Sequence, residues 1–230
     1  MSARLGKSKS SRIRRCNSSQ RAQPNWWKFI LDQKQRYEPG THYAYASGCI
    51  NLTGAMLTYA THTSVPELWD RLVARPLQWQ NWHWNVMPTG EGYLGGGTFV
   101  RTRDILKIGQ LWLNGGTWNG KRIVSADWVK WSTSPHMRVS PETTGVSGDA
   151  FANNYIEGYD AWAWHPAPLT VGGRTYQGYL GNGNGGQMLI VIPEADLAVA
   201  FTAGNYRQGL WWRLKDDIVR DMILPSITAR

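Results

Sequence analysis

The chain has 230 residues, of which 42% are hydrophobic and 18% are charged, a composition that is ordinary for a soluble globular protein with a sizeable core. It contains no apolar run near the roughly 18 residues of a spanning helix, so we expect no membrane span. Two cysteines, Cys16 and Cys49, are too few for a disulfide framework. Neither they nor the histidines show metal-ligand spacing, so we expect no bound metal.

The formal net charge of +9 is concentrated at the start of the chain. Residues 1–24 hold seven of the 25 basic residues and no acidic residue, which leaves 18 basic against 16 acidic residues elsewhere. Because this segment has no apolar periodicity, we predict a disordered tail or a non-native start. The segment lacks the apolar core of a secretory signal. It could also be interpreted as a transit peptide, so the sequence leaves the localisation of the protein open. We expect nucleic acid or an anionic surface to bind, if at all, through this tail alone.

The chain after the tail is expected to form one partial domain over residues 25–224, followed by a second tail at 225–230. Ser64 and Glu67 fit a capping box, and Pro76 must end the helix that begins there. Thr102 and Ser125 are expected to cap two later helices. The predicted helices cover residues 48–60, 64–75, 102–113 and 126–132, and residues 25–31 are expected to form a short helix or a turn.

The last part of the chain predicts strands and one closing helix. Asn119-Gly120 is a two-residue hairpin signal, and residues 159–164 alternate like a half-buried strand. The apolar runs 188–192 and 197–202 predict an antiparallel hairpin, and residues 209–224 carry apolar side chains at helical spacing. This order predicts an α+β protein with a helical lobe and an antiparallel sheet.

A Pro-Gly turn at residues 39–40 is followed by Tyr45-Ala46-Ser47 and then by a short apolar helix. This pattern resembles the second active-site motif of the serine β-lactamase and penicillin-binding-protein family. Four other stretches resemble family segments and keep the family's order from about residue 25 to residue 224. They are Arg75-Pro76-Leu77, residues 95–104, residues 111–125 and residues 185–205.

The resemblance implies a β-lactamase/transpeptidase-like fold and hydrolysis of an ester, amide or β-lactam through an acyl-serine, with no metal or organic cofactor. It implies that the partner is a small ester, amide or peptide-like substrate. Tyr45 would share the general-base role, and Ser47 would take the third motif position, where many family members have asparagine. The family's nucleophile motif, Ser-x-x-Lys, occurs nowhere in the 230 residues. We therefore expect a chain whose N-terminal part is missing and which is inactive as given.

The family's third motif carries a lysine or histidine on a strand, and here the matching position is Gly181. A glycine offers no positive charge for a carboxylate-bearing substrate. Glycines do let a strand edge approach a substrate, and the N–H of Asn184, next to Gly183, would complete an oxyanion hole. The same residues match a dinucleotide-binding Gly-x-Gly-x-x-Gly pattern, which we reject because residues 187–192 continue as a strand and not as a helix.

Two alternatives stand beside this hypothesis. In the first alternative, Tyr45 has no catalytic role and is a core aromatic residue that follows a turn. In the second alternative, the chain is a non-catalytic binding module. It is then either a pseudo-enzyme or a carbohydrate-binding groove lined by tryptophans such as Trp79, Trp82 and Trp84. We favour packing for most of the 14 tryptophans because aromatic side chains bury a large area.

Overall fold

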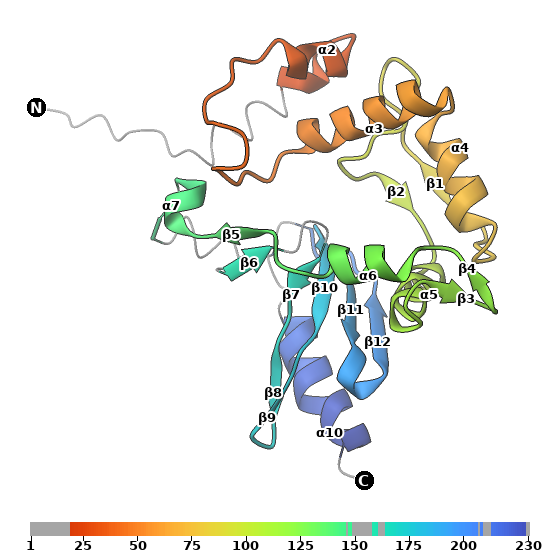
Figure 1. Cartoon of the computed structure of the whole chain (residues 1–230), viewed down its shortest axis with the longest axis vertical. Helices are drawn as coiled ribbons and strands as arrows, with labels where there is room; N and C mark the ends of the chain where they lie inside the picture. The colour runs from red at the N-terminus through yellow and green to blue at the C-terminus, as the bar shows by residue number, and fades with distance from the viewer. Residues whose placement is uncertain are drawn as a thin grey trace, which may run out of the picture. The chain divides into compact units, whose positions relative to one another are not determined.

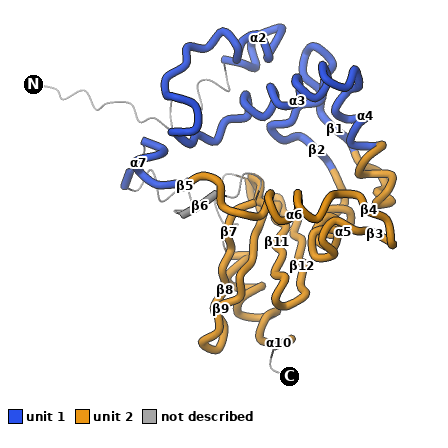
Figure 2. Tube along the Cα trace, viewed as in Figure 1, with its two compact units in different colours: residues 1–70, 83–99, 138–158 blue, residues 71–82, 100–137, 159–230 orange. Residues whose placement is uncertain are grey.

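The computed structural model describes residues 19–145, 147–148, 158–160, 164–206, 208 and 213–228. The chain divides into two compact units, which Figure 2 draws in different colours. Neither unit is a continuous stretch of sequence. Unit 1 comprises Met1–Asp70, His83–Phe99 and Arg138–Gly158, and unit 2 comprises Arg71–Trp82, Val100–Met137 and Tyr159–Arg230.

Unit 1 contains the helices predicted before residue 70, and local side-chain caps begin two of them. Asn25 accepts a 2.9 Å hydrogen bond from the Lys28 N–H, and Ser64 accepts one of 3.4 Å from the Glu67 N–H. The helix after Ser64 ends before Pro76, as predicted. The elements are α2 (Trp26–Leu31), α3 (Ser47–Thr61), α4 (Val65–Trp69), its π-helical continuation η1 (Asp70–Ala74), which enters unit 2, and α7 (Pro141–Thr144).

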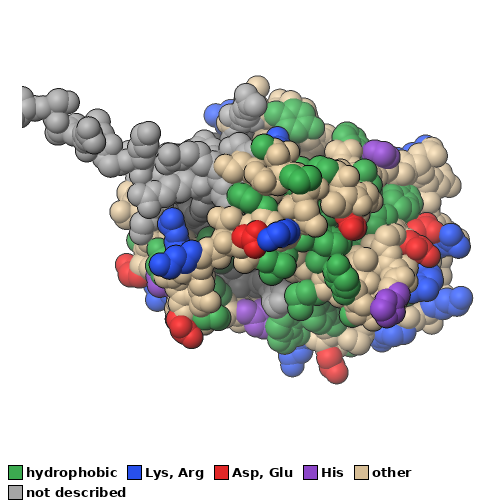
Figure 3. All heavy atoms as spheres, turned by 90° about the horizontal axis from the view of Figure 1, so that it is seen from above, with side chains coloured by type: hydrophobic (Ala, Val, Ile, Leu, Met, Phe, Trp, Pro, Cys, Tyr) green, Lys and Arg blue, Asp and Glu red, His purple; other side chains and the backbone are tan. Residues whose placement is uncertain are grey.

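Helix α3 has no charged residue, and it packs along α2. A Cβ atom on Gly48 would overlap the Ile30 Cδ1 of α2, so the glycine is what permits this close approach. Other positions of α3 are exposed, among them Met56 and Leu57. Surface hydrophobic side chains of this kind are green in Figure 3.

A folded loop of unit 1 lies between two short antiparallel strands, β1 (His83–Trp84) and β2 (Thr98–Phe99). Inside the loop the Asn85 N–H donates to the Gly97 carbonyl, and the Tyr93 N–H donates to the Asn85 carbonyl, both at 2.9 Å. Met87 is buried within the loop. These bonds give residues 85–97 a defined backbone.

Unit 2 is built on a four-stranded antiparallel sheet in the order β12-β11-β10-β7 (Figure 1). Side chains alternate between its faces. On one face Leu180 and Ile190 pack with Val219 of the C-terminal helical segment; on the other, Leu189 packs with Ile108 of α5. The strands are β7 (His165–Pro166), β10 (Tyr179–Gly183), β11 (Gln187–Ile192) and β12 (Leu197–Phe201). The helical elements are α5 (Thr102–Leu113), α6 (Ala126–Ser132), η2 (Pro193–Ala195), the π-helical η3 (Leu214–Ile223) and α10 (Leu224–Thr228).

Three short strand pairs complete the described structure. The predicted hairpin at Asn119-Gly120 is confirmed, with positive φ angles of 46° and 77° at its two turn residues. The pairs are β3 (Thr117–Trp118) with β4 (Lys121–Arg122), β5 (Met137–Val139) with β6 (Gly158–Asp160), and β8 (Leu169–Val171) with β9 (Arg174–Tyr176).

The mixture of helices and antiparallel sheets confirms the predicted α+β class. The cap predicted at Thr102 is wrong: the helix is preceded by Arg101 without a side-chain cap, and the Thr102 hydroxyl lies 2.6 Å from that of Thr202. Residues 161–163 and 209–212, in two predicted elements, lie outside the described residues. The closing helix continues to Thr228, past the boundary predicted at residue 224.

At the other end, Gln20 is only 2% exposed and its Oε1 lies 3.7 Å from the position of a Cβ atom on Gly48. The described fold therefore includes a residue of the segment 1–24 that the charge pattern sets apart. Within the described ranges, no helix is both long and apolar enough to cross a membrane.

Candidate active site

Tyr45 and Ser47 flank the start of α3. Ala46 between them has an extended backbone (φ −140°, ψ 115°), and Ser47 is the first residue of the helix. The Tyr45 side chain is 69% exposed, so its interpretation as a core aromatic residue is wrong. Ser47 is half-buried. The motif thus presents a phenol at the surface, next to a hydroxyl held in the first helical turn.

The turn that leads to Tyr45 is stabilised by its own polar groups. Gly40 has a φ of +81°, a conformation that favours glycine, and the Thr41 hydroxyl donates to the Glu38 carbonyl at 2.7 Å. The His42 ring stacks on Tyr37 with centroids 3.6 Å apart. The Tyr43 N–H then donates to the Thr143 carbonyl at 3.0 Å, which ties the segment before Tyr45 to α7.

Gly183 and Asn184 lie together where β10 ends and turns into β11. Gly183 pairs with Gln187, and the turn between them includes Gly185 and Gly186, with φ angles of 95° and 93°. The Gln187 Nε2 donates to the carbonyls of Asn184, at 3.4 Å, and of Ala203, at 2.5 Å. The side chain of Gln187 therefore holds the turn against the chain that follows β12.

An exposed aromatic ring lies at the same end of the sheet. A Cβ atom on Gly185 would lie 2.8 Å from Cε1 of Tyr206, a residue that is itself 62% exposed. Gly181 is two residues before Gly183 on β10, and a Cβ atom there would meet nothing within 4 Å. The position that carries a cation in the resembled motif is therefore open and holds no side chain.

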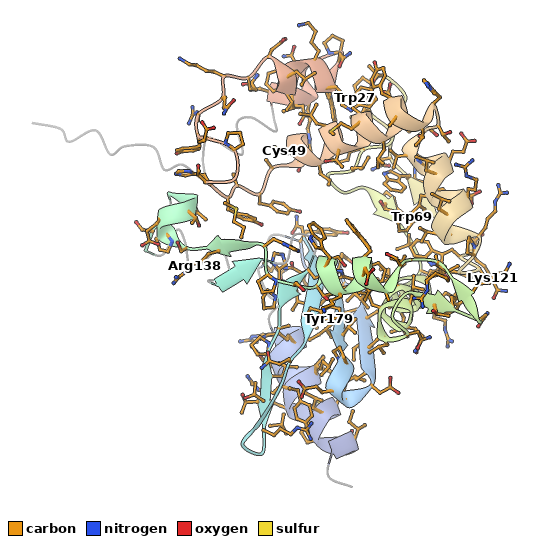
Figure 4. The ribbon with its side chains drawn as sticks, in the orientation of Figure 1. Trp27, Cys49, Trp69, Lys121, Arg138 and Tyr179 are labelled. Carbon is orange, nitrogen blue, oxygen red and sulfur yellow. The ribbon has the colours of Figure 1, made fainter. Side chains whose placement is uncertain are left out.

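Tyr179 lies on the same strand and the same face as Gly181, and Figure 4 labels it. Its ring meets Trp164 edge to face at 5.1 Å, and Trp164 in turn lies 5.6 Å from Trp112 of α5. Burial raises the pKa of the Tyr179 hydroxyl to about 12, so this phenol is protonated at neutral pH. These rings belong to the hydrophobic cluster between the sheet and α5.

The candidate residues belong to different units. Tyr45 and Ser47 belong to unit 1, whereas Gly183 and Asn184 belong to unit 2. Sequence reasoning missed two residues near the Tyr45 motif: the buried Asn51, one turn after Ser47 on α3, and Gly95, on which a Cβ atom would lie 2.5 Å from the Ser47 Cβ. No sequence pattern marks Asn51, because the face of α3 that it shares with Ser47 also carries Gly54 and is not apolar. In the part of the chain that the structure describes, no cluster of three metal-ligating side chains occurs.

Comparisons with known proteins agree with this architecture. The family model for β-lactamase matches residues 8–209, starting inside the basic segment. A solved structure titled "Putative 6-aminohexanoate-dimer hydrolase from Bacillus anthracis" is similar at a TM-score of 0.66 and 16% identity, covering 88% of this chain and 48% of that one. The structure of a "putative beta-lactamase from Bacteroides dorei DSM 17855" is similar at a TM-score of 0.53 and 16% identity. The match covers 86% of this chain and 59% of that one.

This chain thus spans about half to three-fifths of the length of these two structures. At such low identity they show a shared fold and not a shared substrate. The family match, in contrast, covers most of the sequence, and it includes both the Tyr45 motif and the turn at Asn184. The chain belongs to the β-lactamase family.

Proposed function

We propose that this chain is the part of a β-lactamase-related serine hydrolase that supplies the general base and one edge of the substrate site. The observation that carries the proposal is the position of Tyr45, whose side chain is largely exposed directly before α3 and two residues from Ser47. A large aromatic side chain left at the surface contributes little to packing, whereas its hydroxyl is placed to take or give a proton.

In the proposed reaction, Tyr45 accepts the proton of a serine hydroxyl while that oxygen attacks the substrate carbonyl carbon. The developing oxyanion is stabilised by backbone N–H groups, with Asn184 at the end of β10 as one donor. The proton then passes to the leaving group as the bond to it breaks, and water hydrolyses the acyl-serine by the same steps in reverse. The Ser47 hydroxyl hydrogen-bonds to the substrate or to a neighbouring cation.

No serine in the sequence stands three residues before a lysine, so we propose that the acylated serine is not among the 230 residues. By the same reasoning the chain alone has no acyl-serine turnover. The chain then contributes residues to a site that a Ser-x-x-Lys segment must complete.

The open position at Gly181 bears on the substrate class. A strand without a cation there lacks a charge-assisted partner for a substrate carboxylate, so we propose neutral esters and amides over penicillin-like acids. The name of the Bacillus anthracis neighbour refers to a dimer of 6-aminohexanoate, and a bond between two such units is a linear amide. A linear amide is therefore a reasonable first substrate to test beside simple esters.

The experiment compares the chain alone with the chain mixed with the Ser-x-x-Lys segment of an intact family member. The substrates are p-nitrophenyl butyrate, a 6-aminohexanoate dimer and a chromogenic cephalosporin. We expect no turnover by the chain alone and ester or amide turnover by the mixture, lost in Tyr45→Phe. Turnover by the chain alone, or turnover that Tyr45→Phe leaves unchanged, would contradict the proposal.

One observation favours a second candidate function, carbohydrate binding without catalysis. Trp128 and Trp131 of α6 are 47% and 39% exposed, and their rings stack with centroids 5.0 Å apart. The exposed indole of Trp128 suits the apolar face of a sugar ring, while the Trp131 ring also contacts that of His136, with centroids 4.0 Å apart. Trp84, in contrast, packs edge to face on Trp69 and donates to the Tyr93 carbonyl at 2.8 Å.

Titration with soluble β-glucan oligosaccharides, followed by tryptophan fluorescence, tests this second function. Saturable binding that is lost in Trp128→Ala would support it. The exposed Leu72, in the same unit, provides a control variant, Leu72→Ala, which removes apolar surface without removing an aromatic face. An unchanged spectrum at high sugar concentration would remove the candidate.

A further inference from the structure

Residues 93–95, here called the clamp segment, cross α3 at the end that carries the catalytic motif. The helix positions they meet are Ser47, Asn51 and Gly54, which are spaced by four and three residues and so share one face of the helix. All of these residues belong to unit 1. The clamp segment therefore lies against the face of α3 that carries Ser47, Asn51 and Gly54.

The contact is close at each of the three positions. The Leu94 N–H donates to Asn51 Oδ1 at 2.8 Å, and a Cβ atom on Gly54 would lie 2.8 Å from Leu94 Cδ1. A Cβ atom on Gly95 would lie 2.5 Å from Ser47 Cβ, closer than real Cβ atoms approach. Gly95 is thus the residue that leaves room for Ser47, and Asn51 is the residue that bonds the clamp segment to the helix.

The other side of the clamp segment is also fixed. The Tyr93 ring meets Trp26 edge to face at 5.5 Å, and the Tyr93 carbonyl accepts the Trp84 indole N–H at 2.8 Å. The Tyr93 backbone N–H is bonded to Asn85. Tyr93 is thus held by three partners, and Asn51 Oδ1 supplies the side-chain hydrogen bond that joins the next residue, Leu94, to α3.

The side chain of Asn51 lowers the stability of the fold at this position. It is fully buried, and its Nδ2 has no hydrogen-bond partner among the described residues. A buried amide with an unused donor is less favourable than an apolar side chain of similar size. What the amide supplies in return is the acceptor for Leu94, which an apolar side chain cannot provide.

We infer that Asn51 is a positioning residue for Ser47: its side chain latches the clamp segment onto α3, and the clamp segment fixes the Ser47 hydroxyl in the first turn. That this placement serves catalysis rests on the proposed function, but the latch itself is tested separately. When the latch is removed, the clamp segment separates from the helix more often, and position 47 becomes more accessible while the helix remains folded.

Two single-thiol proteins test the latch. One is Cys16→Ser, which keeps the native Cys49, exposed on the first turn of α3 (Figure 4). The other is Cys16→Ser/Cys49→Ser/Ser47→Cys, which places its thiol next to Gly95 of the clamp segment. Each is made with Asn51, with Asn51→Ala, with Asn51→Asp, which keeps an acceptor oxygen, and with the control Thr53→Ala, at an exposed position of the same helix. The rate of reaction with a disulfide reagent is measured for all of them.

We expect Asn51→Ala to speed the reaction at position 47 on the order of tenfold, because a lost buried hydrogen bond favours local opening by about that factor. Cys49 should change less than about twofold, and Asn51→Asp should restore part of the protection. General loosening would speed both thiols equally, and that result, or an unchanged rate at position 47, would overturn the latch. If Asn51→Ala does not reduce hydrolysis by the mixture, the latch still stands as a structural contact, but it does not serve catalysis.

Discussion

The carboxylate of Asp104 lies 2.8 Å from the Nζ of Lys107, one turn further along α5, although the aspartate is only 2% exposed. Its second oxygen accepts a 3.2 Å hydrogen bond from the Gln80 N–H, and Lys107 also donates to the Gln78 carbonyl at 2.6 Å. The pair therefore joins α5 to the segment at residues 78–80 within unit 2.

Removal of this carboxylate should be costly. We expect Asp104→Ala to lower the free energy of unfolding by about 3 kcal/mol, because it leaves the partly buried ammonium of Lys107 without its counter-ion and the Gln80 N–H without its acceptor. The matched control is Asp32→Ala, which breaks the exposed Lys28–Asp32 pair and should cost less than about 1 kcal/mol. Urea denaturation measures both, and equal losses would show that burial does not distinguish the two pairs.

The close packing of α5 on the sheet gives a second prediction. A Cβ atom on Gly109 would lie 2.8 Å from the Ala198 Cβ of β12. We expect overpacking in Gly109→Ala to cost about 1–3 kcal/mol; because the gain of about 1 kcal/mol in helix propensity offsets part of it, the net destabilisation is up to about 2 kcal/mol. Gly181→Ala, at the open position on β10, should be neutral or slightly stabilising. A Gly109→Ala protein as stable as the parent would show that α5 is not packed closely against β12.

The elements that the sequence predicts well are those whose signals are local. Ser125 caps α6 because its hydroxyl reaches the N–H of Trp128, only three residues away. The cap expected at Thr102 fails because the hydroxyl of Thr102 has a partner 100 residues distant, at Thr202. No local pattern contains that contact.

The residues of the candidate site also divide into those with local sequence signals and those without. The exposed Tyr45 and the turn at Asn184 belong to short motifs that can be read along the chain. Asn51 and Gly95 could not be found in that way, because their roles arise from a loop that returns to α3 some 43 residues later. Contact across such a separation is decided by tertiary packing.

The buried phenol on β10 gives a prediction about pH. The pKa of Tyr179 is raised to about 12 by burial, whereas an unfolded tyrosine ionises near pH 10. Between these values the unfolded state releases a proton that the folded state keeps, so the free energy of unfolding falls as pH rises from about 10 to about 12, and below pH 10 this group has no effect. The decline in urea midpoint between pH 9 and pH 11.5 should be smaller in Tyr179→Phe. An identical decline in the parent and in Tyr179→Phe would show that other titrating groups cause the loss of stability.

The open position at Gly181 predicts a change of substrate preference. Gly181→Lys should fold like the parent, since its Cβ atom meets nothing within 4 Å. In the mixture with the Ser-x-x-Lys segment, it should lower KM for a carboxylate-bearing β-lactam on the order of tenfold, with little change for p-nitrophenyl butyrate. The neutral variant Gly181→Gln controls for side-chain length. A shift of equal size with glutamine would show that charge is not the cause.

The most direct test of the whole account is the rate at which the mixture of this chain and a Ser-x-x-Lys segment becomes acylated, followed by intact mass spectrometry with a p-nitrophenyl ester. We expect the acyl group on the serine of the added segment, and Tyr45→Phe should slow its formation by about 10²–10⁴-fold, the usual contribution of a general base. The control is Tyr59→Phe, which alters a tyrosine of similar exposure, 73% against 69%, at the far end of α3. Acylation that proceeds equally fast in Tyr45→Phe would contradict the central claim.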